Sequence, residues 1–103
     1  MTLNDTFAMQ LNANCIGHER EYKAIPGRRF AYDFYLPEYN LLIELQGGTW
    51  MKRSGHNSGS GIQRDCEKLN LAVLEGFDVM HFTTDDVEDG TAINMVLKYL
   101  EEK

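Results

Sequence analysis

The sequence lacks the features of a secreted or membrane-spanning chain. It begins MTLNDTFAMQ, without the basic start and continuous apolar run of a secretory signal. No stretch approaches the roughly 20 apolar residues that a membrane-spanning helix needs. We therefore expect a cytoplasmic protein with no membrane partner.

Cysteine is scarce, and its spacing excludes the usual zinc and disulfide frameworks. Cys15 and Cys66 lie far apart and belong to no CxxC or Cys/His cluster. A disulfide is not expected in a reducing compartment, so both are predicted to be small buried hydrophobic residues.

What is present suits one compact domain over residues 1–103. Apolar residues make up 43% of the chain and aromatic residues 11%, which is enough for an ordinary core. A chain of this length can bury roughly 60–70% of its unfolded surface. A single globular domain is predicted.

The net charge of −6 at first argues against a nucleic-acid partner, but its distribution does not. Residues 20–68 carry eight basic and six acidic side chains, whereas residues 69–103 carry two basic and eight acidic ones. A locally basic segment with embedded carboxylates suits a surface that meets a polyanion through a metal. An ordinary mixed surface is the alternative.

Hydrophobic spacing and turn residues predict a mixed α/β fold. The expected order is helix, three strands, long glycine-rich loop, helix, strand, helix. The expected ranges are 3–16, 22–25, 29–36, 41–46, 47–61, 62–75, 77–82 and 91–101. Long loops inside compact domains are often functional.

The predicted hairpin around residues 37–40 brings two carboxylates together. If these four residues form the turn, paired residue numbers add up to 77, so Asp33 faces Glu44. The same register places Phe34, Tyr32 and Leu36 on one apolar face, opposite Ile43, Leu45 and Leu41. The register therefore has independent support.

On the other face of the hairpin Asp33, Glu44 and Gln46 converge. Two carboxylates about 5 Å apart repel each other unless something compensates them. A bound Mg²⁺ or Mn²⁺ ion would do so, since both prefer hard oxygen ligands. Solvent exposure, or an ion pair with an arginine such as Arg29, is the alternative.

These residues resemble the PD-(D/E)XK motif of restriction-endonuclease-like enzymes. A longer series is similar to small phage and bacterial endonuclease-domain proteins related to very-short-patch-repair endonucleases. That series spans roughly residues 20–83 and comprises EYK (21–23), RRFAYDF (28–34), IELQGGTW (43–50), HNSGSG (56–61), DCEKLN (65–70) and GFDV (76–79).

The resemblance implies a restriction-endonuclease-like three-layer α/β sandwich, with a central mixed sheet of about four strands flanked by helices. It also implies a Mg²⁺- or Mn²⁺-dependent endodeoxyribonuclease, in a bacterial cell or encoded by a phage, with a role such as DNA repair. Asp33, Glu44 and the Leu45 carbonyl would hold the metal. Four basic residues would contact the DNA backbone: Arg28, Arg29, Lys52 and Arg53.

Gln46 departs from the family pattern, which usually has lysine at this position. Glutamine supplies no positive charge, so Lys68 and His56 are candidates to replace the lysine, and Gln46 would orient the attacking water. Lys68 lies one helical turn from Asp65, and a surface contact is its alternative. The resemblance places Glu21 beside Asp33 as an accessory acid, with a solvent-facing strand residue as the alternative. His18 and His81 are interpreted as ordinary residues.

Three functions follow from these residues, and a small regulatory α/β domain unrelated to nucleic acid is the alternative to all three. The first is duplex DNA cleavage. The second is a DNA-binding or assembly module that keeps the fold but has impaired catalysis, as Gln46 suggests. The third is a Holliday-junction resolvase acting on branched DNA, which would work as a symmetric homodimer.

Overall fold

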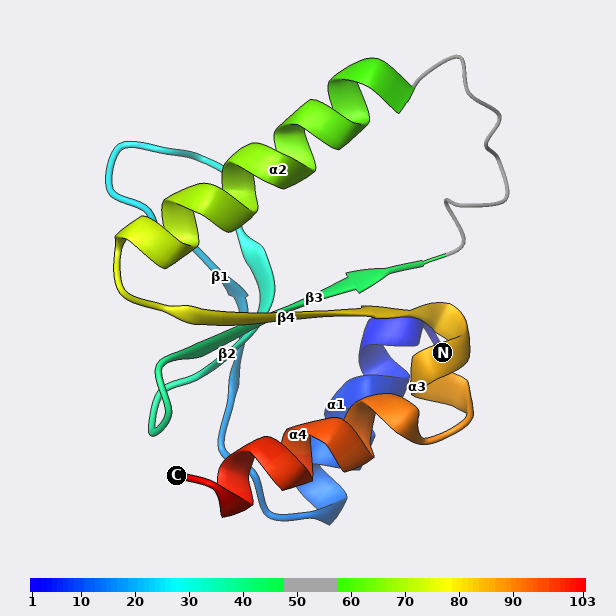
Figure 1. Cartoon of the computed structure of the whole chain (residues 1–103). Helices are drawn as coiled ribbons and strands as arrows, with labels where there is room; N and C mark the ends of the chain where they lie inside the picture. The colour runs from blue at the N-terminus through cyan, green and yellow to red at the C-terminus, as the bar shows by residue number, and fades with distance from the viewer. Residues whose placement is uncertain (48–57) are drawn as a thin grey trace.

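The protein folds around one four-stranded sheet with helices on both faces (Figure 1). The computed structural model describes the backbone of residues 1–47 and 58–103, and the side chains of residues 1–47 and 61–103. The described elements are α1 (Leu3–Ala13), β1 (Glu19–Tyr22), β2 (Tyr32–Leu36), β3 (Leu41–Gln46), α2 (Ser58–Leu74), β4 (Asp78–Thr83), α3 (Thr84–Glu88) and α4 (Thr91–Glu101).

The strands lie in the order β1-β2-β3-β4. β1–β2 and β2–β3 are antiparallel, whereas β3 and β4 are parallel. A parallel pair needs a long crossover, and α2 supplies it. The chain is therefore a mixed α/β sandwich, as the sequence predicts.

Two hydrophobic cores hold the layers together, one on each face of the sheet. α1, α3 and α4 cover the first face, where Phe7 and Val96 pack against Phe34 and Ile43. α2 covers the second face and contributes Ala72 to a smaller core. The division into three layers follows from these two cores.

Several predicted boundaries are confirmed and others are wrong. β3 and α4 begin and end where the sequence analysis places them. The first strand is Glu19–Tyr22 rather than 22–25, because Tyr22 pairs with Tyr32 and the chain then turns at Ile25, whose carbonyl accepts from Arg28 N–H. β2 starts at Tyr32 rather than at residue 29.

The first helix ends four residues before Gly17. Cys15 adopts the left-handed conformation at φ 58°, and Ile16 N–H donates back to the Leu11 carbonyl. This is the helix-ending geometry that glycine usually provides. Cys15 is thus exposed at a helix end, and Cys66 is also exposed, so the prediction that both cysteines are buried is wrong.

Two further features of the helices differ from the prediction. α2 begins at Ser58, so the predicted loop over 47–61 is helical from residue 58. α3 was not expected, although its Thr83/Asp86 capping box is a recognisable start signal. Within the described residues, no helix combines the length and the apolar character that crossing a bilayer requires.

Candidate active site

The candidate site lies where the β2–β3 ladder ends. The pairs Phe34↔Ile43, Tyr35↔Leu42 and Leu36↔Leu41 confirm the predicted register. Beyond Phe34 the carboxylates replace the ladder bonds: Asp33 N–H donates to Glu44 Oε1 at 3.0 Å, and Leu45 N–H donates to Asp33 Oδ2 at 2.8 Å. Each carboxylate is thereby fixed to the backbone of the neighbouring strand.

Glu44 is a buried acid with a specific partner. It is 8% exposed, and its Oε2 lies 2.5 Å from Lys68 Nζ. Burial raises the pKa of the Glu44 carboxyl, the Lys68 ammonium opposes that rise, and the Asp33 carboxylate adds to it. Asp33, Glu44 and Lys68 thus form one electrostatic unit.

Lys68 is mostly buried and contacts Glu44, in place of the alternative surface contact with Asp65. Its ammonium also donates to the Ala31 carbonyl at 2.8 Å, and it lies over the rings of Tyr32 and Phe30 at 4.7 and 5.5 Å from their centroids. A cation over two rings gains further electrostatic stabilisation. The α2 face that carries Lys68 therefore points at the sheet.

Tyr32 ties α2 to the same place. Its hydroxyl donates to the Lys68 carbonyl at 2.7 Å, and the side chain packs in the α2-side core. The prediction that Tyr32 shares the apolar face with Phe34 is therefore wrong. Burial, followed by the negative charge of Glu44, raises the pKa of Tyr32 to about 12.

Replacing Tyr32 by phenylalanine is expected to lower the free energy of unfolding by about 1 kcal/mol, because the bond to the Lys68 carbonyl is lost. Urea denaturation measures this value. The alkaline absorbance titration of the variant should also show one tyrosine fewer near pH 12, where Tyr99 titrates as well. An unchanged unfolding midpoint would show that this bond does not hold α2 to the sheet.

Glu21 lies in the strand position opposite Asp33. Its neighbours Arg20 and Tyr22 pair with Phe34 and Tyr32, and Glu21 itself has a left-handed backbone at φ 54°. Non-glycine residues rarely adopt this conformation outside turns, and such residues often occur at functional sites. The side chain is exposed, so the structure puts Glu21 at the predicted position but facing solvent.

Gln46 is the last residue of β3 and pairs with Thr83 of β4. It is half-buried, and strand alternation puts it on the same side of β3 as Glu44. The structure therefore brings Gln46 near the two acids but at the outer end of the strand.

The predicted DNA-contacting residues are only partly described. Arg28 lies 2.5 Å from Glu67 of α2, and both side chains are more than 40% exposed. Arg29, the next residue in the chain, is exposed as well. Lys52, Arg53 and His56 lie outside the described residues, so their predicted roles stay predictions.

His81, which the sequence indicates is an ordinary residue, lies beside Glu44 in the structure. It pairs with Glu44 in the parallel β3–β4 register and so faces the same side of the sheet. Partial burial lowers the pKa of His81, while the Asp65 carboxylate opposes this effect and Lys68 reinforces it. The signal was available, since a strand-helix-strand order predicts a parallel pair and alternation then puts one residue of the last strand beside Glu44.

The oxygen atoms of this site suit a hard divalent cation that takes few of its ligands from the protein. No group of three His, Cys, Asp or Glu side chains with metal-binding spacing occurs within residues 1–47 and 61–103. The candidate donors are the carboxylates of Asp33 and Glu44, each fixed in direction by a backbone N–H group. Mg²⁺ commonly binds one or two carboxylates and retains water, so these residues fit it chemically.

The chain was compared with protein families, curated proteins and solved structures. No protein-family model and no curated protein matches the chain. Among solved structures, the chain is similar to the homing endonuclease I-Bth0305I catalytic domain, with a TM-score of 0.70 and 19% sequence identity. The similarity covers 95% of this chain and 91% of that one. At this identity the similarity concerns the fold, and it confirms a four-stranded mixed sheet flanked by helices in a nuclease-like arrangement.

Proposed function

We propose that this protein is a metal-dependent endodeoxyribonuclease that hydrolyses DNA phosphodiester bonds. The observation that carries the proposal is the pair of carboxylates at the end of the β2–β3 hairpin, with Lys68 bound to one of them. The shared fold with a protein named as a homing endonuclease catalytic domain supports it.

Asp33 and Glu44 are the proposed metal ligands, together with the Leu45 carbonyl. A Mg²⁺ or Mn²⁺ ion bound there would supply a water of lowered pKa and offset negative charge on the transition-state phosphate. The backbone bonds at 3.0 and 2.8 Å hold the two carboxylates in place before substrate arrives. Such preorganisation reduces the reorganisation needed during the reaction.

Lys68 takes the role that a strand lysine has in the resembled motif. It approaches from α2, and its positive charge opposes the rise that burial causes in the pKa of Glu44. Gln46 would orient the attacking water from the end of β3, and Glu21 would assist from the exposed side of Asp33. His56 is proposed to contact the scissile phosphate or the leaving oxygen.

Arg28, Arg29, Lys52 and Arg53 are proposed to contact the DNA backbone. Contacts to phosphate position a protein without reading sequence. Because Arg28 is paired with Glu67 at the protein surface, DNA phosphate would have to compete with that carboxylate for the guanidinium. We therefore expect binding that weakens with added salt and has little sequence preference.

Gln46 favours a second candidate, a DNA-binding module of the same fold with impaired catalysis. In the structure Lys68 is already engaged by Glu44 and the Ala31 carbonyl. If these contacts persist with DNA bound, the Lys68 ammonium does not reach the phosphate.

A plasmid-nicking assay separates the two candidates. The purified chain is incubated with supercoiled plasmid in Mg²⁺, in Mn²⁺ and in EDTA, while binding to a labelled duplex is followed in parallel. Nicking that needs the metal supports the nuclease. DNA binding without nicking in either metal supports the non-catalytic module and contradicts the nuclease. Branched and linear duplexes, assayed side by side, test the resolvase alternative.

A further inference from the structure

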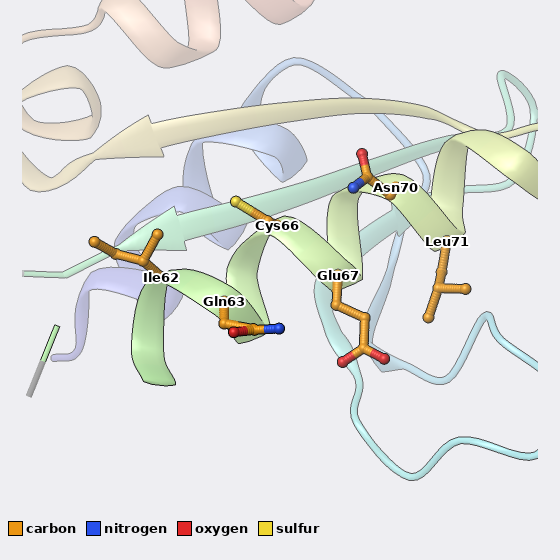
Figure 2. A pocket seen from close by; sticks show the side chains of 6 residues that line it. All are labelled: Ile62, Gln63, Cys66, Glu67, Asn70 and Leu71. Carbon is orange, nitrogen blue, oxygen red and sulfur yellow. The ribbon is translucent and has the colours of Figure 1, made fainter. Parts of the chain in front are cut away.

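α2 exposes an apolar stripe on the side that does not face the sheet. Four apolar residues recur at helical spacing there, and we call them the α2 stripe: Ile62, Cys66, Leu69 and Val73. Ile62 is 60% exposed, Leu69 38% and Val73 58%, and Cys66 is exposed as well. Figure 2 shows Ile62 and Cys66 on one side of the helix, with Glu67 and Leu71 on another. A hollow of the α2 surface adjoins the stripe and is lined by Gln63 and Asn70, among others.

This orientation is unusual, because an apolar stripe of that spacing normally faces a core. Here the sheet side of α2 carries Lys68 and Ala72 instead. The Lys68–Glu44 pair therefore turns the stripe outward. Contiguous exposed apolar surface often marks an interaction site.

We propose that the α2 stripe docks against the α2 stripe of a second copy of this chain, in an antiparallel pair related by a twofold axis. The spacing of the stripe is symmetric about its own midpoint, with gaps of four, three and four residues. An antiparallel copy therefore places Ile62 opposite Val73 of the second copy, and Cys66 opposite its Leu69. A self-complementary patch is what a twofold dimer requires.

The polar residues of α2 are compatible with this arrangement although the chain carries a net charge of −6. Among the described residues of α2, the charged side chains are two basic and two acidic: Arg64, Lys68, Asp65 and Glu67. Glu67 and Lys68 are already paired within their own copy, with Arg28 and Glu44. The charges on the described part of α2 therefore sum to zero.

The available area predicts a weak dimer. The α2 stripe exposes on the order of 300 Å² of apolar surface per copy, at the low end for a functional patch. Because roughly 57% of a typical interface is apolar, the whole interface would measure on the order of 1,000 Å² in total. This lies near the lower limit for a specific contact, so a dissociation constant in the micromolar range is expected.

Sedimentation velocity over protein concentrations from about 1 to about 200 µM tests the dimer. Wild type should shift from monomer to dimer, and Val73→Glu should weaken the dimer by at least about 50-fold because it buries two unpaired charges. Leu74→Glu is the matched control, since Leu74 is 80% exposed but lies off the stripe. It should change the dissociation constant less than about threefold. Added salt should strengthen the dimer by screening the net charges.

A cross-link tests the register independently of affinity. In a background with Cys15→Asn and Cys66→Ala, the pair Ile62→Cys and Val73→Cys should give a covalent dimer on mild oxidation. Both positions lie on one helix about 16 Å apart, too far for a bond within one chain. The pair Ile62→Cys and Leu74→Cys should not cross-link. A wild type that stays monomeric, equal effects of the two glutamate variants, or cross-linking of the Leu74 pair would each overturn the proposal.

Discussion

Replacing Asp33 by asparagine is expected to reduce metal-dependent DNA cleavage by about 10³-fold while leaving the fold intact. The loss corresponds to about 4 kcal/mol of transition-state stabilisation, as expected when a ligand of the catalytic metal loses its charge. The amide oxygen of asparagine can still accept the hydrogen bond that Leu45 N–H now donates to Asp33 Oδ2. The hairpin should therefore keep its geometry, and single-turnover nicking of plasmid DNA measures the effect.

Stability gives a second readout for the same variant. The Asp33 carboxylate raises the pKa of Glu44, so removing its charge lets the Glu44 pKa fall toward its ordinary value. The free energy of unfolding should stay the same or increase slightly, which separates a loss of function from a loss of fold. Titration calorimetry with Mn²⁺ should show weaker binding in parallel with the loss of cleavage.

Glu38→Gln is the matched control, because Glu38 is an exposed acid in the turn of the same hairpin. It removes one negative charge from the β2–β3 hairpin without touching the site, and its cleavage rate should stay within about twofold of wild type. If Asp33→Asn cleaved DNA at the wild-type rate, Asp33 would not be a ligand of the catalytic metal. Equal losses in both variants would point to the overall charge of the hairpin instead.

The hairpin could be predicted from the sequence because its information is local. A Pro37–Asn40 turn and alternating apolar residues fix the register, and the observed pairs Phe34↔Ile43 and Leu36↔Leu41 follow from it. The end of the ladder could not be predicted. Asp33 and Glu44 bind backbone N–H groups with their side chains, which competes with regular strand pairing and ends the β2–β3 ladder at Phe34.

The orientation of α2 shows why periodicity alone misplaces a functional helix. Ile62, Cys66, Leu69 and Val73 have the spacing of a core-facing stripe, yet they face outward. The sheet side of α2 must instead supply a cation to the buried Glu44. The orientation that local hydrophobic spacing favours and the one that the whole fold requires conflict more often at functional sites than elsewhere. Here the buried charge of Glu44 determines which side of α2 faces the sheet.

His81 illustrates the limit of reading histidines one at a time. Its own sequence neighbours carry no motif, so only the pairing of β4 with β3 brings it beside Glu44. The Glu21 backbone at φ 54° is likewise a property of the folded β1–β2 pair. Long-range pairing, rather than composition, places both residues at the site.

The second large effect is expected for Lys68→Met, which should lower the free energy of unfolding by about 3 kcal/mol at neutral pH. The side chains of Lys68 and Glu44 are only 12% and 11% exposed, so solvent cannot compensate the carboxylate that is left behind. Removing one partner of a buried ion pair typically costs this much. Lys103→Met is the control, since its pair with Asp78 at 3.5 Å is half exposed and its loss should cost at most about 0.5 kcal/mol.

The pH dependence of this variant identifies the unpaired acid. Burial already raises the pKa of Glu44, and without the ammonium only the hydrogen bond from Asp33 N–H opposes that rise. A carboxyl whose pKa is higher in the folded than in the unfolded state stabilises the fold when protonated and loses that contribution as the pH rises. Lys68→Met should therefore regain stability relative to wild type when the pH is lowered from about 7 to about 5.

A double-mutant cycle completes the test. Glu44→Gln alone sets an amide against the buried ammonium and should also destabilise the fold, whereas Glu44→Gln combined with Lys68→Met removes both charges. The double variant should recover more than about half of the loss seen in Lys68→Met, because neutral groups of similar volume can replace a buried pair at little cost. Urea denaturation of the four proteins gives the coupling energy. Additive losses with no pH dependence would show that Lys68 stabilises α2 by packing on Tyr32 and Phe30 rather than by its charge.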